Sequence, residues 1–251
     1  LRAALVRQGM STEILLALAT DTDEMIARTA VREIVRRRPV DSEAMLLPLL
    51  STAAPSVRQV ISRAIGQRTF NNYWDRFERL SPKMRLSAGR ALLRLLPDAT
   101  QRLGRKIISG DLAAKMRGLQ IVQELSCAQP LREVVSAMTS HGDAKIRSKA
   151  VLLLSQLTSP PPGVLVDRAL GDTDSRVRSN AIEVLEHQSQ ADYVPLLTER
   201  TKSPVSRERA NAIKALATMQ VSLASPALVA MLRDPRSDHR VSGLWVLRQV
   251  G

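Results

Sequence analysis

The chain is poor in aromatic side chains. Only six of its 251 residues are Phe, Trp or Tyr, while Leu, Ala, Val and Ile dominate. The core must therefore be aliphatic, and aliphatic side chains suit the packing of helix against helix. No run approaches the roughly 18 apolar residues that a membrane-spanning helix requires. The composition thus favours a helical core and predicts no membrane span.

Cysteine and histidine are also scarce. The single Cys127 excludes an internal disulfide, which fits a reducing compartment and predicts a cytoplasmic protein, with Cys127 as a small core residue. The three histidines (His141, His187 and His239) lack the spacing of metal ligands, and we expect His141 and His239 in solvated turns. No G-x-S-x-G, phosphate-cradling glycine loop or H-E-x-x-H occurs. We therefore expect no enzyme activity, no cofactor and no metal.

Acidic residues are outnumbered by basic ones. Lysine and arginine total 37 against 24 aspartates and glutamates, which gives a net charge of +13 and an isoelectric point near 11.0. Such a balance favours an anionic partner, namely nucleic acid, an anionic membrane surface or an acidic protein. Arginine outnumbers lysine 30 to 7, so an arginine-rich genome composition is a rival explanation.

A pattern of about 31 residues recurs along the chain. With Asp174 as position zero, Val177 follows at plus three, Arg178 at plus four, Ala181 at plus seven and Leu185 at plus eleven. The same register starts at seven further residues: Asp23, Ala54, Ser81, Ala113, Asp143, Val205 and Arg236. The spacing is 30 to 32 residues, except between the second and third copies, where it is 27. Seven of the eight plus-four positions are arginine.

Positions three, seven, eight and eleven form one apolar stripe at helical period. Each repeat is therefore predicted to contain a helix of about fourteen residues, preceded by a shorter apolar helix such as residues 164–170. Prolines separate the two helices, and several follow a capping residue, as in Asp234-Pro235, which is typical of a helix start. No alternation of period two competes, so we expect no strands.

Two helices of this size cannot bury their apolar faces alone, whereas stacked pairs share one continuous core. We therefore predict an all-α protein, a right-handed α-solenoid of about eight stacked helix pairs, with residues 1–251 as a single domain. Leu1 and Leu5 fit plus seven and plus eleven of a further copy, so we expect the chain to be a fragment of a longer protein.

The best-formed copy reads D-x-D-x-x-V-R-x-x-A-x-x-x-L from Asp172 to Leu185 and resembles HEAT-type repeats. The period resembles the short bacterial variety, which also occurs in the phycobilin lyase HEAT-like family. The resemblance covers essentially the whole chain but is weaker over residues 54–125, where Ser62 and Gly89 stand at the usually aliphatic plus-eight position. It implies an armadillo-like interaction scaffold that binds protein. A role in cofactor attachment, as in the lyases, would rest on fold analogy alone.

We interpret the plus-four arginines as structural. They neighbour the apolar stripe in the first turn of each longer helix, and aspartates stand at or just before the same helix starts, where they suit the positive helix terminus. An arginine fork can bind an aspartate of its own or the neighbouring repeat. We therefore expect an Asp/Arg ladder that sets the register between repeats and includes Arg117, Asp143, Arg147, Asp172, Arg178, Arg209 and Arg240.

Four of the six aromatic residues lie within residues 70–77, FNNYWDRF. Their spacing of three and four favours one face of a short first helix, ahead of a second helix that begins at Ser81. We interpret the cluster as core at an irregular joint, and expect either Tyr73 or Trp74 to be partly exposed. Trp74-Asp75 also invites comparison with HEAT-like alkylpurine DNA glycosylases. In such folds the first helix faces the convex side, so we do not expect that activity.

The remaining candidate site is a basic stripe. In HEAT-type stacks the second helices line the concave side, and positions two, nine and thirteen point away from the core. These positions hold Arg32, Arg36, Arg63, Lys83, Arg90, Arg94, Lys115, Lys145, Arg176 and Arg207. An ordinary solvated face is the alternative interpretation. If the stripe binds, its ligand is anionic and elongated, and we expect a protein partner, with nucleic acid held by its phosphates as the alternative.

Overall fold

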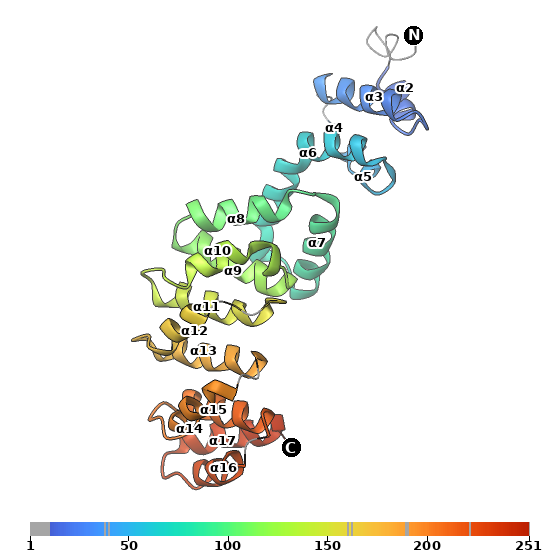
Figure 1. Ribbon diagram of the computed structural model, residues 1–251. Coiled ribbons are helices and arrows are strands. Elements are labelled where there is room, and N and C mark those ends of the chain that lie inside the picture. Colours follow the sequence, from blue (N-terminus) through green and yellow to red (C-terminus); the bar gives the residue numbers. More distant parts are fainter. Residues whose placement is uncertain are drawn as a thin grey trace. The chain divides into compact units, whose positions relative to one another are not determined.

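The computed structural model describes residues 11–37, 39, 41–159, 161, 163–188, 191–220 and 222–250, without the side chains of residues 43, 187, 188 and 191. Over these residues every regular element is a helix and none is a strand (Figure 1). The predicted all-α solenoid class of fold is therefore confirmed, while its handedness and number of helix pairs stay predictions. Leu1, Leu5 and the side chain of His187 lie outside the described residues.

The chain divides into two compact units, Leu1–Leu103 (unit 1) and Gly104–Gly251 (unit 2). Unit 1 contains α2 Thr12–Leu18, α3 Glu24–Arg37, α4 Ser42–Leu46, α5 Leu49–Thr52, α6 Pro55–Arg76, the 3₁₀ turn η1 Phe77–Arg79, α7 Pro82–Leu95 and the start of α8 Ala99–Ser109. Unit 2 contains α9 Leu112–Leu125, η2 Gln129–Leu131, α10 Arg132–Met138, α11 Ala144–Leu153, η3 Leu154–Gln156, α12 Gly163–Leu170, α13 Ser175–Gln188, η4 Ala191–Tyr193, α14 Val194–Arg200, α15 Ser206–Thr218, α16 Ala224–Leu232 and α17 Ser237–Val250.

The longer helices begin where the repeat register places them. Position zero is the N-cap of most of them, and where it is Asp or Ser its side chain accepts hydrogen bonds from the free N–H groups of the first turn. The Asp143 carboxylate accepts from Lys145 N and the Asp23 carboxylate from Met25 N, at 2.8 and 2.9 Å. One helix start differs from the register. The N-cap of α9 is Asp111, two residues before Ala113, which stands at position zero of this copy.

In unit 2 the helices form two layers. Helices α9, α11, α13, α15 and α17, the long-helix layer, pack in that order, each against the next (Figure 1). The shorter helices α10, α12, α14 and α16 each pack on the longer helix that follows them in the chain. The plus-seven alanines, among them Ala150 and Ala181, are fully buried in this arrangement. The apolar stripe read from the sequence is thus the core of unit 2.

Unit 1 departs from this pattern at α6. The sequence predicts a break near residue 68, between a second helix that starts after Ala54 and a first helix at 70–80, but α6 runs unbroken from Pro55 to Arg76. Helix α7 packs antiparallel to α6. Near the end of α6, Tyr73 Oη donates to Arg85 O at the start of α7 (3.1 Å), and nearer the start of α6, Ser62 Oγ donates to Leu95 O at the end of α7 (3.3 Å). Residues that share a register position on these two helices are therefore not aligned side by side.

The aromatic cluster is entirely core. Trp74 is 4 % exposed and Tyr73 8 %, so the expectation that one of them is partly exposed is wrong. Trp74 stacks on Phe70 with 6.2 Å between ring centroids, and Tyr73 meets the edge of Phe77 at 5.8 Å. Adjacent residues on a helix point about 100° apart, so both can be buried only where the helix is covered on more than one side. The continuous α6 meets that condition.

The continuity of α6 can be tested by proline substitution. Arg68→Pro should lower the free energy of unfolding by about 3 kcal/mol or more, because proline inside a helix removes a hydrogen bond and clashes with the preceding turn. Arg68→Ala keeps the helix and serves as the control for loss of the side chain. Urea unfolding followed by far-UV circular dichroism measures both. Equal stability of the two variants would instead indicate the break that the sequence predicts.

Candidate functional site

The plus-four arginines of unit 2 connect neighbouring repeats. Arg147 binds Asp172 with both arms of its fork, Nε–Oδ2 at 2.7 Å and Nη2–Oδ1 at 2.9 Å, and Arg209 Nη1 binds Asp234 Oδ2 at 2.6 Å. The Arg147 guanidinium is the main group that lowers the pKa of Asp172. The N–H of Arg236 and the Arg209 side chain hold the pKa of Asp234 at about 2. Both carboxylates stand two residues before a position zero.

Between α13 and α15 the carboxylate comes from a different position. Arg178 binds Glu208 (Nη2–Oε1, 2.6 Å), which stands at plus three of the next repeat, a position that Val177 and Ile146 fill in other copies. Glu208 is 1 % exposed. Ser203 occupies the place of the expected aspartate, and its hydroxyl donates to Glu208 Oε2 at 3.1 Å. A serine and a glutamate thus replace one aspartate.

The last copy has a histidine at the same core position. His239 is fully buried, so the expected solvated turn is wrong for this residue. Its Nε2 lies 3.2 Å from Pro204 O, and its Nδ1 lies 3.3 Å from the guanidinium nitrogens of Arg209 and Arg236. The carbonyl requires a donor and the two guanidinium groups require an acceptor. The surroundings therefore favour a proton on Nε2 and a lone pair on Nδ1.

Asp143 and Arg240, also expected in the ladder, have local contacts. Asp143 caps α11, and Arg240 Nη1 donates to the carbonyls of Asp234 and Pro235 at 2.8 and 2.7 Å. Arg117 is half-buried on α9. The role of the ladder in setting the register therefore stays a prediction, with three inter-repeat carboxylate contacts to support it.

Sequence reading missed a second connection between long helices. Asn180 Nδ2 donates to Ser148 O and Asn211 Nδ2 to Ser179 O, both at 2.8 Å. The two asparagines are buried and stand at plus six of successive repeats, while the serines stand at plus five. Their spacing of 31 residues is the signal that identifies them, since a polar residue repeated at a buried position needs a partner.

The basic stripe is not uniform. Arg32, Arg63, Arg90, Arg94, Lys83 and Lys145 are exposed and have no ion pair with any described residue. By contrast, Lys115 Nζ donates to the carbonyls of Ile107, Ile108 and Gly110 at 2.7–3.0 Å, so its expected role on a binding face is wrong. It satisfies the free carbonyls at the end of α8, as a cation near a helix C-terminus does.

Three further stripe residues are paired with acidic or amide groups. Arg36 binds Glu33, whose pKa is lowered to about 2 chiefly by its hydrogen bonds to Arg36 and Arg37. Arg176 binds Asp174 at 2.7 Å. Arg207 Nη2 donates to Asn180 Oδ1 at 2.7 Å.

Because α7 runs antiparallel to α6, the register does not align Arg90 and Arg94 beside Arg63, and one continuous stripe stays a prediction.

A groove crosses the long-helix layer at α13, α15 and α17. It has a volume of about 410 Å³ and is lined by Glu183, Arg207, Ala210, Asn211, Val241, Ser242 and Trp245. We refer to it as the α13–α17 groove. Trp245 stands at plus nine and is 39 % exposed. The Lys214 ammonium lies 5.5 Å from the centre of the Trp245 ring and 3.1 Å from Glu186 Oε2. The groove thus combines an exposed indole with the charged side chains of Glu183 and Arg207, and the Lys214–Glu186 ion pair lies beside the indole.

Reactive groups are not gathered anywhere in the described chain. Burial raises the pKa of the Cys127 thiol to about 11, so the thiolate nucleophile is disfavoured. No group of three or more His, Cys, Asp or Glu in the described residues has an arrangement that could hold a metal ion. Within the same residues, no helix has the length and apolarity needed to cross a membrane.

Among known protein families, the model described as HEAT repeats matches residues 161–248. YibA of E. coli has a similar structure (13 % identity, TM-score 0.44, covering 95 % of this chain and 83 % of that one). An engineered protein is also similar (17 %, 0.43, covering 99 % and 80 %), as is human deoxyhypusine hydroxylase in complex with glycerol (14 %, 0.37, covering 98 % and 97 %). At TM-scores below 0.5 and at these identities, the activities of those proteins support no conclusion about the activity of this chain. No curated protein matches the chain. The match to the HEAT-repeat model confirms the HEAT-like resemblance.

The Arg178–Glu208 contact yields a stability prediction. Glu208→Ala should lower the free energy of unfolding by about 3–5 kcal/mol, because it leaves Arg178 and Arg200 without their shared buried carboxylate. Glu199→Ala is the control, since this neighbouring glutamate is exposed and should change stability by less than about 0.5 kcal/mol. Urea denaturation measures both. A cost of less than about 1 kcal/mol for Glu208→Ala would show that this contact behaves as an exposed pair.

Proposed function

We propose that the chain is a non-enzymatic scaffold that binds a protein partner across the α13–α17 groove. The single observation that carries the proposal is the exposed Trp245 at the edge of a groove of about 410 Å³ on the long-helix layer. The HEAT repeats in which the groove lies are generally non-enzymatic interaction modules. The resemblance to HEAT-type stacks implies that this layer lies on the concave side, the usual binding side of such folds.

The chemistry of the groove fits a peptide segment. Trp245 and Val241 offer apolar surface for one side chain of the partner, and tryptophan is enriched among residues that contribute most to protein interfaces. The side chains of Glu183 and Arg207, 4.0 Å apart, also line the groove and can each exchange this loose ion pair for a contact with the partner. Asn211 completes the floor and is held by its bond to Ser179 O. An apolar anchor with polar contacts around it is the common arrangement of protein interfaces.

Substitution of Trp245 tests this proposal. Trp245→Ala should weaken partner binding at least about tenfold, because a tryptophan anchor commonly contributes more than 1.4 kcal/mol, and it should leave the melting temperature nearly unchanged. Leu244→Ala is the control, since Leu244 is 59 % exposed on the same helix but does not line the groove. Proteins retained from nuclease-treated lysate are quantified by mass spectrometry, and the affinity of the purified partner is then measured by calorimetry. Equal retention by the two variants would contradict the proposal.

Nucleic-acid binding by unit 1 is the second candidate. The observation that favours it is the group of exposed arginines Arg32, Arg63, Arg90 and Arg94, which no described carboxylate neutralises. Contacts of this kind would be to phosphates, so affinity should fall steeply with salt and ignore base sequence. An acidic protein partner would instead show salt dependence mainly in its association rate.

Charge reversal tests the second candidate. Arg32→Glu, Arg63→Glu and Arg90→Glu combined should abolish binding of a labelled random-sequence oligonucleotide, with little loss of stability, because exposed charges contribute little to folding. The control combines Arg105→Glu, Arg233→Glu and Arg248→Glu, which are exposed and change the net charge equally. Fluorescence anisotropy at several salt concentrations measures both. The candidate fails if the two triple variants lose affinity equally, since net charge rather than a site would then explain binding.

A further inference from the structure

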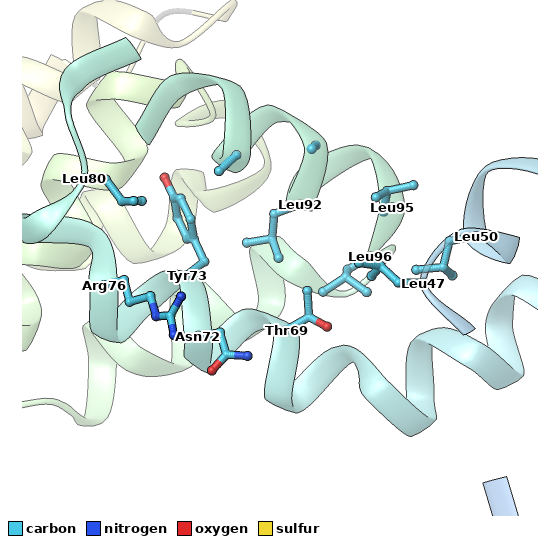
Figure 2. A pocket seen from close by; sticks show the side chains of 12 residues that line it. Leu47, Leu50, Thr69, Asn72, Tyr73, Arg76, Leu80, Leu92, Leu95 and Leu96 are labelled. Carbon is cyan, nitrogen blue, oxygen red and sulfur yellow. The ribbon is translucent and has the colours of Figure 1, made fainter. Parts of the chain in front are cut away.

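Unit 1 contains an apolar groove between α6 and α7. Its volume is about 330 Å³, and its walls come from α5, α6 and α7 together with Leu47 and Leu80 (Figure 2). Most of the lining is leucine and alanine, including Leu50, Leu92 and Leu95. The volume lies at the lower end of the range of about 300–1,000 Å³ that is usual for small-molecule sites.

The groove exists because α6 is one helix. The break expected near residue 68 is absent, so the second half of α6 continues the first and packs against α7, with α5 at one end of their junction (Figure 2). The α7 side of that junction carries the small residues Ala88 and Ala91, which leave room for the groove. The apolar space is therefore a consequence of the irregular repeat and not of an isolated packing defect.

The polar groups of the groove gather at one end. Two of the four are used internally, because Thr69 Oγ1 donates to Ile65 O and Tyr73 Oη donates to Arg85 O, both at 3.1 Å. Asn72 and Arg76 are exposed, and their side chains bind no other described residue. Figure 2 shows these two at one end of the groove, while Leu47, Leu50, Leu95 and Leu96 lie at the other.

We infer that this groove binds a medium-chain anionic amphiphile, with its hydrocarbon tail among the leucines and its anionic head group, a carboxylate or a phosphate, on Arg76. A guanidinium binds a carboxylate through two N–H groups, and Asn72 adds a further donor. From Thr69 to Arg76 the groove follows seven residues of α6, about 10 Å at 1.5 Å per residue, so the tail is of medium length. An inorganic anion would leave the leucines exposed, and a plain hydrocarbon would leave Arg76 without its counter-charge.

Calorimetry with straight-chain carboxylates tests the tail. Affinity should rise about fourfold for each added methylene between hexanoate and decanoate, the increment for burying one CH₂ group, and should level off at longer chains once the groove is full. Ala91→Leu should abolish this binding by filling the groove. Ala88→Leu is a second filling variant, at an exposed lining position that tolerates a larger side chain. Retained decanoate binding in a folded filling variant would overturn the inference.

The head group is tested with Arg76→Gln. This variant should bind decanoate about tenfold more weakly and decanol as well as the wild type does, because a charge-assisted hydrogen bond is lost only for the acid. Arg79→Gln, an exposed arginine one turn on and outside the groove, is the matched control and should change neither affinity. Equal loss for acid and alcohol, or no saturable binding by the wild type, would contradict the assignment.

Sedimentation with vesicles distinguishes the two sources of such a ligand. If the amphiphile is a membrane lipid, the wild type should co-sediment with vesicles of phosphatidylcholine and phosphatidylglycerol, and Ala91→Leu should not. If it is a free fatty acid, decanoate should bind while the vesicles retain neither protein. Vesicle retention that is equal in wild type and Ala91→Leu would show that the surface charge binds the membrane and that the groove does not.

Discussion

The stacking in unit 2 depends on a small residue seven positions after each helix start. Ala150, Ala181 and Ala212 stand there and are fully buried. In the last copy the position is Gly243, where an added Cβ would lie 3.1 Å from Leu232 Cδ2 of the neighbouring α16. Protein interiors are close-packed, so a larger side chain at this position would force the two layers apart. The distances that the polar contacts require are available only because this position stays small.

Apolar burial brings the helices together but does not fix how far one slides along the next, since it is non-directional. The inter-repeat contacts of Arg147, Arg178 and Arg209 are directional, and each joins a plus-four arginine to a carboxylate of the following copy. The exchange of an aspartate for Ser203 and Glu208 keeps the contact while moving the carboxylate to another position. We interpret this as evidence that the contact itself, rather than any one residue, is what the stack requires.

Most of the fold could be predicted from the sequence because the register repeats. Position zero locates the starts of α3, α7 and α13 because capping chemistry is local and acts within one turn. The continuous α6 was missed, although two signals were present. The spacing there is 27 rather than 31 residues, so four residues, about one helical turn, are missing. In addition, neither proline nor an Asp or Ser cap stands at residues 66–69, unlike the other junctions.

The candidate sites were harder to predict because they depend on which side chains meet across helices. Lys115 and Arg176 have the pattern of a binding row, but one caps a helix and the other binds its own helix start. His239 has the pattern of a turn residue and is buried at plus three, where only the full register shows that it replaces an apolar residue. The type of the residue alone therefore predicted the wrong surroundings, whereas its position in the repeat predicts the right ones.

These exceptions indicate where function is to be sought. In the regular copies the repeated positions are occupied with folding: alanines separate the layers, and arginines, aspartates and asparagines join one copy to the next. A net charge of +13 therefore overstates the cationic surface that is free to bind, since part of it is held in inter-repeat contacts.

The positions left for binding are those where a copy departs from the pattern. Trp245 replaces the charged or aliphatic residues of plus nine in other copies, and the unbroken α6 replaces a helix pair. Both departures lie beside a groove, which a regular stack of helix pairs would have filled with its own side chains.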